Sequence, residues 1–247
     1  MKKKNRNWIY SLIIMGVCLL LTESCKKDEV INKVVKEIMF NPDLTYGTVT
    51  DIENNVYKTI TIGTQTWMAE NLRTTKYRNG DPITNGTDAA EWKNFVTGAY
   101  CDYENTGSND SIAVFGLLYN WYAATDSRNI APEGWHIPGD AEWTTLTAFL
   151  LGDSIAGGKL KESDITHWIT PNQGASNASG FTAIPGGNIG YESSTKFKGI
   201  NYTGFWWSST EFSATTAWFR VMTSGYKSVG RKSVNKYDGF SLRCLKD

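Results

Sequence analysis

The sequence predicts an α+β domain that is rich in loops, with mostly antiparallel short strands and two main helices. Three observations predict this class. Short alternating apolar segments recur along the chain, two longer segments carry apolar residues at helical spacing, and Gly, Asn, Ser and Thr are spread between them. Hydrophobic residues make up 40% of the 247 residues, which is enough for a packed core and argues against a disordered chain.

The first strand is expected at residues 56–62, where Val56, Ile60 and Ile62 would share one buried face. Gly63 and Thr64 suit a two-residue hairpin turn that leads into a return strand at 65–68.

The two main helices are expected at 115–125 and 140–151, because both segments space their large apolar side chains three or four residues apart. Gly152 is a natural stop for the second helix. Gly139 stands at the N-cap of this helix and offers no side-chain oxygen, so only Glu142 can contribute to a capping box.

The second half of the chain is strand-like at 206–210, 217–222 and 239–245. In the last of these segments Phe240, Leu242 and Cys244 would share one face, with Ser241 and Arg243 on the other.

Residues 1–24 are typical of a lipoprotein signal peptide. Four basic residues precede a 14-residue apolar run at 8–21, which fits a secretory signal and is shorter than the roughly 20 residues that span a bilayer. Ser24 and Cys25 resemble a bacterial lipoprotein cleavage box, which makes Cys25 the expected site of lipid attachment, including palmitate. An ordinary signal peptide that is cleaved near an incidental cysteine is the alternative.

Residues 25–46 form the expected tether or stalk helix. Apolar pairs recur every four residues between positions 30 and 39, which keeps one apolar stripe on a helix. A stalk helix that docks on the domain or pairs with another copy, and a partly ordered tether, are both compatible with this pattern. Pro42 breaks any helix, and residues 47–247 follow as one domain.

Composition excludes several classes of function. The 25 basic residues balance the 25 acidic ones, and removing residues 1–24 leaves a net charge of −3, so nothing indicates nucleic-acid binding. The two histidines, His136 and His167, leave little material for a zinc site or a His-based triad. We therefore expect no cofactor, no metal site and no enzymatic activity.

Seven separated segments appear in one order and carry a family resemblance. They are TQTWMAENL (64–72), YNWYAA (119–124), PEGWHIP (132–138), EW (142–143), SGFTAIPGG (179–187), WWSSTE (206–211) and GFSLRC (239–244). Together they resemble the Fibrobacter succinogenes major paralogous domain of Bacteroidetes-type surface lipoproteins, over about residues 47–247. That family is distantly similar to the C-type-lectin-like fold and its formylglycine-generating-enzyme branch, so the resemblance implies a C-type-lectin-like domain.

Cys101 and Cys244 are the cysteines left to form a disulfide. Export favours pairing, but the family's usual partner for Cys244 lies where this chain has Ala131. Two free thiols, with Cys244 as a small buried apolar residue, are the alternative. The resemblance to formylglycine-type oxidases would require a second cysteine close to Cys244, which the sequence lacks.

Trp206 and Trp207 are the candidate ligand platform, because adjacent strand residues face opposite sides and one ring could lie exposed near Glu211 and Arg220. Cover by a neighbouring loop is the alternative. Four other tryptophans are expected to pack in the core: Trp67, Trp121, Trp135 and Trp143. His136 is expected to be a hydrogen-bonded structural residue and His167 a surface loop residue.

The loop at 102–110 gathers five oxygen-bearing side chains, which leaves calcium binding there an open question.

These observations predict a non-catalytic, lipid-anchored protein of the outer membrane or cell surface that displays one binding or adhesion domain. Its partner would be a glycan or an envelope protein. The alternative is a structural accessory subunit that stabilises an envelope assembly through the stalk.

Overall fold

The hairpin expected at residues 56–68 is present and forms the middle of the first sheet. The computed structural model describes residues 36–190 and 196–247. Strands β2 (Val56–Ile62) and β3 (Gln65–Met68) pair antiparallel. β1 (Gly47–Thr50) pairs with β2, and β13 (Leu245–Lys246) lies between β3 and β7 (Trp135–His136). The predicted face was wrong at Val56, which is exposed.

The second sheet contains the strands that the sequence predicts in the second half of the chain. Its order is β12 (Gly230–Asn235), β11 (Thr216–Thr223), β10 (Thr203–Glu211), β8 (Gly186–Ile189) and β9 (Phe197–Ile200). All neighbours are antiparallel except β8 and β10. The final predicted strand is mostly irregular, and its residues 239–241 join the sheets through single bridges at Tyr119, Ile189 and Trp206.

A third, smaller sheet includes the middle of the first predicted helix, at residues 118–119. It contains β4 (Thr84–Asn85), β5 (Ala99–Cys101) and β6 (Leu118–Tyr119). The helix expected at 115–125 was wrong: α2 (Asn109–Phe115) ends at Gly116, and α3 (Trp121–Ala124) begins after Asn120. Gly116 has a φ of 72°, which ends the helix, and β6 then pairs with β5. Two 3₁₀ turns complete this region, η1 (Trp92–Asn94) and η2 (Tyr103–Asn105).

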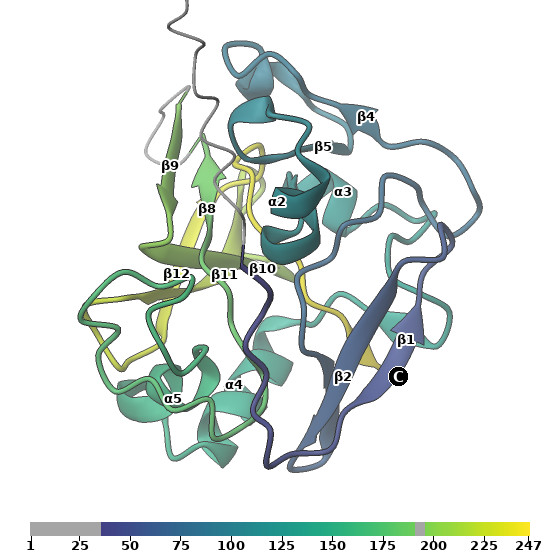
Figure 1. The fold of residues 1–247 in the computed structure, drawn as a ribbon. Helices are drawn as coiled ribbons and strands as arrows, with labels where there is room; N and C mark the ends of the chain where they lie inside the picture. The colour runs from purple at the N-terminus through teal and green to yellow at the C-terminus, as the bar shows by residue number, and fades with distance from the viewer. Residues whose placement is uncertain (1–35, 191–195) are drawn as a thin grey trace, which may run out of the picture. The chain divides into compact units, whose positions relative to one another are not determined.

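The second predicted helix is confirmed as α4 (Asp140–Phe149), which is followed by α5 (Asp153–Leu160). The Gly139 amide donates to Glu142 Oε2 at 2.7 Å, so the half of the capping box that glycine allows is present. In Figure 1 both helices lie below the β10–β12 strands, whereas α2 and α3 lie near β5. None of the described helices is long and apolar enough to cross a bilayer.

Two main hydrophobic cores lie on opposite faces of the strands. We call core A the cluster that includes Tyr57, Trp135, Trp207, Phe240 and Cys244, and core B the cluster that includes Ile60, Trp67, Trp143, Leu160 and Trp206. β2 contributes Tyr57 to core A and Ile60 to core B because alternate residues of a strand face opposite sides.

The four tryptophans expected in the core are divided between these two clusters. The rings of Trp67 and Trp143 lie 4.8 Å apart in core B, Trp135 is buried in core A, and Trp121 packs against the edge of core A. Their core role is confirmed, although they do not form one cluster.

Residues 36–46, the described part of the predicted stalk, contain no helix. They run across the domain as irregular chain before β1 (Figure 1). Ile38 packs against Val114, Phe115 and Ile184, and Phe40, Leu44 and Tyr46 pack against core B. The helical alternative is therefore wrong for these residues, and residues 25–35 lie outside the described part of the chain.

The Asn71 and Arg243 side chains join five segments of the chain at the centre of the domain. Arg243 is fully buried and its guanidinium donates to Asn71 Oδ1 at 2.9 Å and to the carbonyl oxygens of Met68, Phe181 and Thr182 at 3.1, 2.6 and 2.8 Å. Asn71 Oδ1 also accepts from Trp206 Nε1 at 3.0 Å, and Asn71 Nδ2 donates to the Phe115 carbonyl at 2.9 Å. Burial lowers the pKa of Arg243 to about 9, which leaves the guanidinium charged at neutral pH.

We predict that Arg243→Met lowers the free energy of unfolding by about 3–5 kcal/mol, because it leaves buried acceptors without donors. Urea unfolding followed by tryptophan fluorescence measures this change. Arg128→Met is the matched control, since the Arg128 side chain is 39% exposed and its ion pairs with Asp81 and Asp126 lie at the surface. Equal losses in the two variants would contradict a central role for Arg243.

Candidate functional site

Trp206 and Trp207 do not form a surface platform, so that prediction was wrong. Both side chains are 0% exposed. They face opposite sides of β10 as expected, but each side is covered: Trp206 lies in core B, and Trp207 lies in core A with its Nε1 donating to the Tyr119 carbonyl at 2.8 Å. The tryptophan that does reach the surface of this sheet is Trp218, which is half-buried beneath the Arg231 guanidinium, 3.6 Å from its ring centroid.

Glu211 and Arg220 also take part in separate contacts. Arg220 is 1% exposed, and its Nη1 donates to Asp140 Oδ1 at 2.6 Å, which fixes the start of α4 against the sheet. Glu211 is exposed and pairs with Lys236 at 2.7 Å. Trp206 and Arg220 are neighbours across β10 and β11, but both are buried, and the four predicted ligand-binding residues do not form one exposed site.

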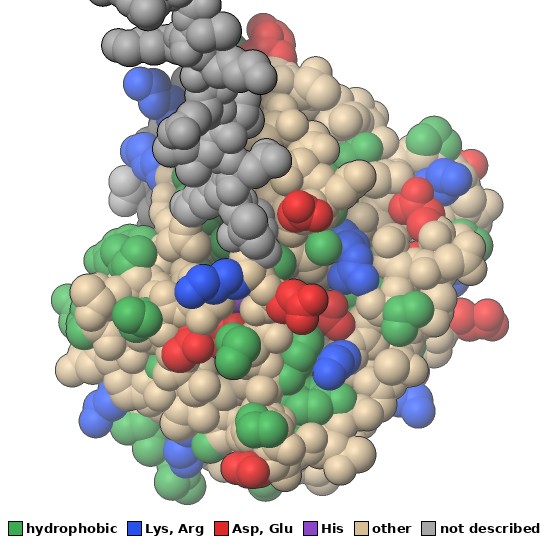
Figure 2. All heavy atoms as spheres, viewed as in Figure 1, with side chains coloured by type: hydrophobic (Ala, Val, Ile, Leu, Met, Phe, Trp, Pro, Cys, Tyr) green, Lys and Arg blue, Asp and Glu red, His purple; other side chains and the backbone are tan. Residues whose placement is uncertain are grey.

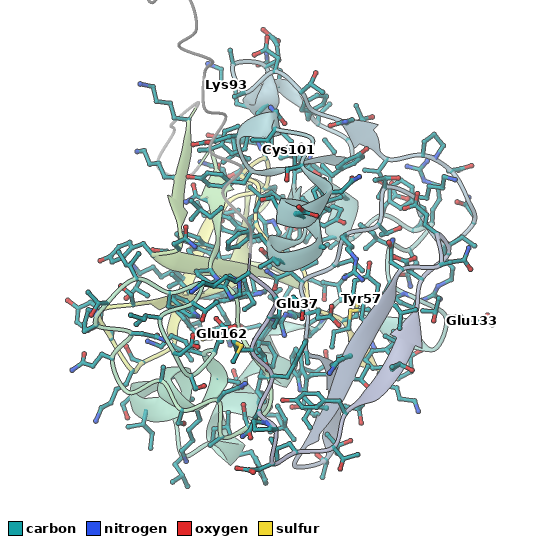
Figure 3. The ribbon with its side chains drawn as sticks, in the orientation of Figure 1. Glu37, Tyr57, Lys93, Cys101, Glu133 and Glu162 are labelled. Carbon is teal, nitrogen blue, oxygen red and sulfur yellow. The ribbon has the colours of Figure 1, made fainter. Side chains whose placement is uncertain are left out.

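Of the two alternatives for Cys101 and Cys244, the structure has two free thiols and no disulfide, and both cysteines are buried. Cys244 lies in core A, whereas Cys101 lies in a separate cluster with Trp92 and Leu118. Figure 3 labels Cys101 near the η1 and α2 region. Burial raises the pKa of both thiols above the usual range, and so keeps them protonated and unreactive. Cys244 thus behaves as the small apolar residue that was the alternative.

In the loop at 102–110, Asp102 is held by hydrogen bonds within the loop, whereas Asn105 Oδ1 is buried without a hydrogen-bond partner among the described residues. Asp102 Oδ2 accepts from the Gly107 amide at 2.9 Å and from Thr106 Oγ1 at 3.1 Å, and Asn105 Nδ2 donates to the Thr87 carbonyl at 2.8 Å. Across residues 36–190 and 196–247, no three His, Cys, Asp or Glu side chains are grouped so that they could hold a metal ion.

The two histidines are both hydrogen-bonded, but only one as expected. His136 Nδ1 lies 2.7 Å from Asp247 Oδ1 and its Nε2 lies 3.0 Å from Glu142 Oε1, which confirms its structural role. The surface prediction for His167 was wrong, because the side chain is 3% exposed and its Nδ1 lies 2.8 Å from Glu162 Oε2. Loop position alone does not reveal that a loop is covered by another segment.

A polar cavity of about 410 Å³ is a candidate for a binding site in the described chain. It lies between the β1–β2 turn, β5 and the loop that leads into α2. Its lining is mainly polar and includes Glu53, Asn55, Arg73, Thr75, Asn85, Tyr100, Asp102 and Asn109. These residues come from five separate parts of the chain, so the cavity exists only in the folded domain.

Hydrogen bonds hold the charged groups of this cavity in place. Arg73 Nη2 donates to the Val56 carbonyl at 2.7 Å, and its guanidinium lies 4.3 Å from the Tyr57 ring centroid. Burial alone would raise the pKa of Glu53, but hydrogen bonds from Thr75 and Thr74 outweigh it and lower the pKa, so Glu53 stays ionised. The lining contains two acidic side chains, Glu53 and Asp102, and one basic side chain, Arg73. Its net charge is therefore negative, which disfavours anionic ligands.

Tyr100 is half-buried and packs against Tyr119, with 6.4 Å between the ring centroids. Burial and the nearby charge of Glu53 raise the pKa of Tyr100, so its hydroxyl stays protonated at neutral pH. The cavity therefore combines an aromatic ring with amide, hydroxyl and carboxylate groups. The sequence analysis included Asp102 and Asn109 in the polar loop at 102–110, but it missed Tyr100. The local signal is that Tyr100 stands between buried Ala99 and Cys101 in β5, so its side chain lies on the opposite face of the strand from theirs.

Asp238 is the second unusual group, because it is a fully buried carboxyl to which no described residue donates a hydrogen bond. A Cβ atom added to Gly190 would lie 3.0 Å from Asp238 Oδ1, so the two segments are in close contact. Burial raises the pKa of Asp238 to about 7. The folded state therefore favours the neutral acid, and stability present at low pH is lost as the pH rises toward and through 7.

We predict that Asp238→Asn increases the free energy of unfolding at pH 8.5 and leaves it unchanged near pH 3.5. The free energy of unfolding rises at pH 8.5 because the variant carries no charge at this buried position. The expected gain is about 1.4 kcal/mol for each unit by which the fold raises the pKa of Asp238. Urea titrations at the two pH values measure it. Asp88→Asn is the control, since Asp88 is exposed. A gain that is equal at both pH values would contradict the assignment.

The fold and the cavity together define a loop-rich α+β domain of mostly antiparallel curled sheets with a polar hollow on its surface. The chain belongs to the Fibrobacter succinogenes major domain family, whose model matches residues 60–246. The match runs from within β2 to the end of β13 and contains most of the cavity. No curated protein and no solved structure matched the chain in these comparisons.

Proposed function

We propose that this protein is a non-catalytic, lipid-anchored protein of the outer membrane or cell surface that binds a ligand through one C-type-lectin-like domain. The polar cavity between the β1–β2 turn and β5 carries the binding part of the proposal. The lipid anchor rests on the N-terminal sequence, in which Cys25 follows a short apolar run and Ser24.

The protonation states of the described side chains support binding rather than catalysis. Cys101 and Cys244 are buried thiols with raised pKa values, and both histidines are held between hydrogen-bond partners. In the cavity itself, Glu53 is a hydrogen-bonded anion and Tyr100 a protonated phenol. General acid–base catalysis needs a group poised near the working pH, which these two groups are not.

The lining of the cavity suits a neutral ligand rich in hydroxyl groups, such as a segment of a glycan. Each hydroxyl both donates and accepts a hydrogen bond, and the amides of Asn55, Asn85 and Asn109 offer both functions. The ring of Tyr100 supplies an apolar face against which a sugar ring can pack. Charged side chains of both signs are interspersed on the face in Figure 2, as expected for a surface that attracts no single strongly charged partner.

We predict that Cys25→Ala abolishes lipid labelling. Cells that express the wild type or the variant are grown with an alkyne analogue of palmitate, and the purified proteins are compared after fluorescent coupling. Cys18→Ala is the matched control, because Cys18 lies within the apolar run of the signal peptide. Equal labelling of the wild type and Cys25→Ala would refute the anchor.

We predict that Asn85→Ala and Tyr100→Ala each weaken glycan binding by at least tenfold. The full-length protein, purified in detergent, is applied to a glycan array, and the affinity for the glycan that gives the strongest signal is then measured by calorimetry. Tyr226→Ala is the control, since Tyr226 is a 65% exposed tyrosine outside the cavity. Unchanged affinity in both cavity variants would refute this site.

A silent array together with a stoichiometric protein partner from envelope extract would favour the alternative, a structural accessory subunit. This alternative requires the stalk to contact other proteins of the assembly. Residues 38–46 of the stalk pack on the domain itself instead, which leaves less of it for such contacts.

A further inference from the structure

A buried histidine–glutamate pair holds the N-terminal segment 36–46 on the domain. His167 and Glu162 follow α5 and are 3% and 0% exposed. His167 Nδ1 lies 2.9 and 2.8 Å from the two oxygens of Glu162, and His167 Nε2 lies 2.9 Å from the Lys36 carbonyl oxygen. The Met39 amide donates to Glu162 Oε1 at 2.7 Å. Figure 3 shows Glu162 beside the segment that carries Glu37.

The partners of His167 determine its charge. The Lys36 carbonyl oxygen can only accept, so His167 Nε2 must carry a proton. Glu162 already accepts from the Met39 amide and acts as a carboxylate, so His167 Nδ1 donates as well. A ring that donates from both nitrogens is an imidazolium. The bond to Lys36 and the ion pair with Glu162 therefore exist together only while His167 is protonated.

The surroundings of the imidazolium favour the charged form. Burial alone would lower the pKa of His167, but the hydrogen bond and the charge of Glu162 outweigh it, with further contributions from the Lys36 carbonyl and Asp164, and the pKa is raised. Two uncharged groups also contact His167: Phe115 meets the ring edge-on at 5.7 Å, and Asn201 Nδ2 donates to the His167 backbone carbonyl at 2.8 Å.

Away from this pair, the contacts of the segment lie mostly at residues 40–46, where Lys58 Nζ lies 4.3 and 5.4 Å from the ring centroids of Phe40 and Tyr46. Ile38, Phe40, Leu44 and Tyr46 are all only partly buried, and Asn41 Nδ2 donates to the Asn177 carbonyl at 3.1 Å. The segment forms no strand or helix before β1. Two hydrogen bonds to a charged pair are therefore a large part of what keeps residues 36–39 in place, since bonds to charged groups are the stronger ones.

We propose that residues 36–46 form a releasable strap, and that the surface between α2, the 162–177 loop and core B is its docking site, closed by the His167 imidazolium. Deprotonation of His167 leaves one N–H on the ring, and the Glu162 carboxylate, the stronger acceptor, holds it at Nδ1. The Nε2 lone pair then faces the Lys36 carbonyl oxygen, so the bond between the ring and the strap is lost and the strap is held at this end by the Met39 amide alone. The strap is stable on the domain below the ordinary pKa of histidine, near 6.5, and docking is lost as the pH rises through the raised value.

The consequence at a membrane rests on the proposed anchor at Cys25. With the strap docked, Lys36 lies 11 residue steps after Cys25; with it released, the first fixed residue, Gly47, lies 22 steps after Cys25. At about 3.3–3.6 Å per residue, the maximum reach grows from roughly 40 Å to roughly 75 Å. Release would thus let the binding domain stand further from the lipid surface.

Hydrogen exchange of the full-length protein tests the strap without any need for the anchor. We expect protection of residues 36–46, corrected for the intrinsic pH dependence of exchange, to fall at least fivefold between pH 6 and pH 9. Protection of the β2–β3 hairpin, residues 56–68, should stay constant, which separates strap release from global changes such as the titration of Asp238. Constant protection of the strap across this range would overturn the proposal.

Variants of the chain's two histidines provide the matched comparison. His167→Gln should lower strap protection at pH 6 at least fivefold and remove its pH dependence, whereas His136→Gln should behave as the wild type. Glu162→Gln, which keeps the acceptor for Met39 but removes the charge, should reproduce the loss if His167→Gln fails to fold. Wild-type protection in His167→Gln, or loss of the pH dependence in His136→Gln, would overturn the proposal. Because Cys25→Ala leaves every strap contact in place, the exchange result and the lipid-labelling result can fail separately.

Discussion

The bonds between Arg243 and the carbonyls around Asn71 are the constraint on which the rest of the domain depends. The closing segment 239–245 runs between the sheets, where Gly239, Phe240 and Ser241 form single bridges and Leu245 belongs to β13. Buried carbonyl groups without hydrogen-bond partners are costly. The guanidinium offers five donors in one plane, and it donates here to three backbone carbonyls and to Asn71 Oδ1. One side chain thus joins the closing segment to β3 and to residues 181–182.

Lys161 is a second buried cation that joins separate segments through their backbone carbonyls. Its ammonium group is buried and donates to the carbonyls of Gln173, Thr223 and Tyr226 at 3.1, 3.0 and 2.9 Å, which joins α5 to the end of β11 and to a loop. Burial lowers the pKa of Lys161 to about 8. Buried loops contain many backbone carbonyls that are not paired in strands or helices, and these can accept hydrogen bonds from buried cations. Asp238, in contrast, has no hydrogen-bond donor among the described residues, so the fold favours its neutral form.

The cavity and the strap share a physical origin in this loop-rich construction. The cavity and the strap are both formed by chain segments that contact one another through side chains and not through long strand ladders. Both therefore bring together polar groups that lie far apart in the sequence. Glu53 is fixed by Thr74 and Thr75 and is ready for a ligand without rearrangement. The strap, by contrast, is held at one end by a pair whose charge depends on pH, which makes its docking adjustable while the sheets stay intact.

Local patterns in the sequence were sufficient for the elements whose contacts are close in the chain. The 56–68 hairpin, the 140–149 helix and the alternating faces of 240–244 follow from periodicities of two and 3.6 residues, and the seven ordered motifs identified the family. Periodicity failed where distant segments decided the outcome. Gly116 ends the predicted helix because Asn71 packs against it: an added Cβ would lie 2.6 Å from Asn71 Cβ.

The exposure of individual side chains also could not be predicted from the sequence, because it depends on distant segments that cover them. Trp206 and Trp207 were correctly assigned to opposite faces, but no pattern shows that both faces are covered. His167 lies in a loop that the segment 36–39 covers from more than 120 positions away. The sequence by itself determined the 56–68 hairpin, the 140–149 helix and the family, because those depend on neighbours along the chain. The tertiary structure decided the cavity, the buried charges and the strap, because burial and pairing depend on segments that come together only when the whole domain folds.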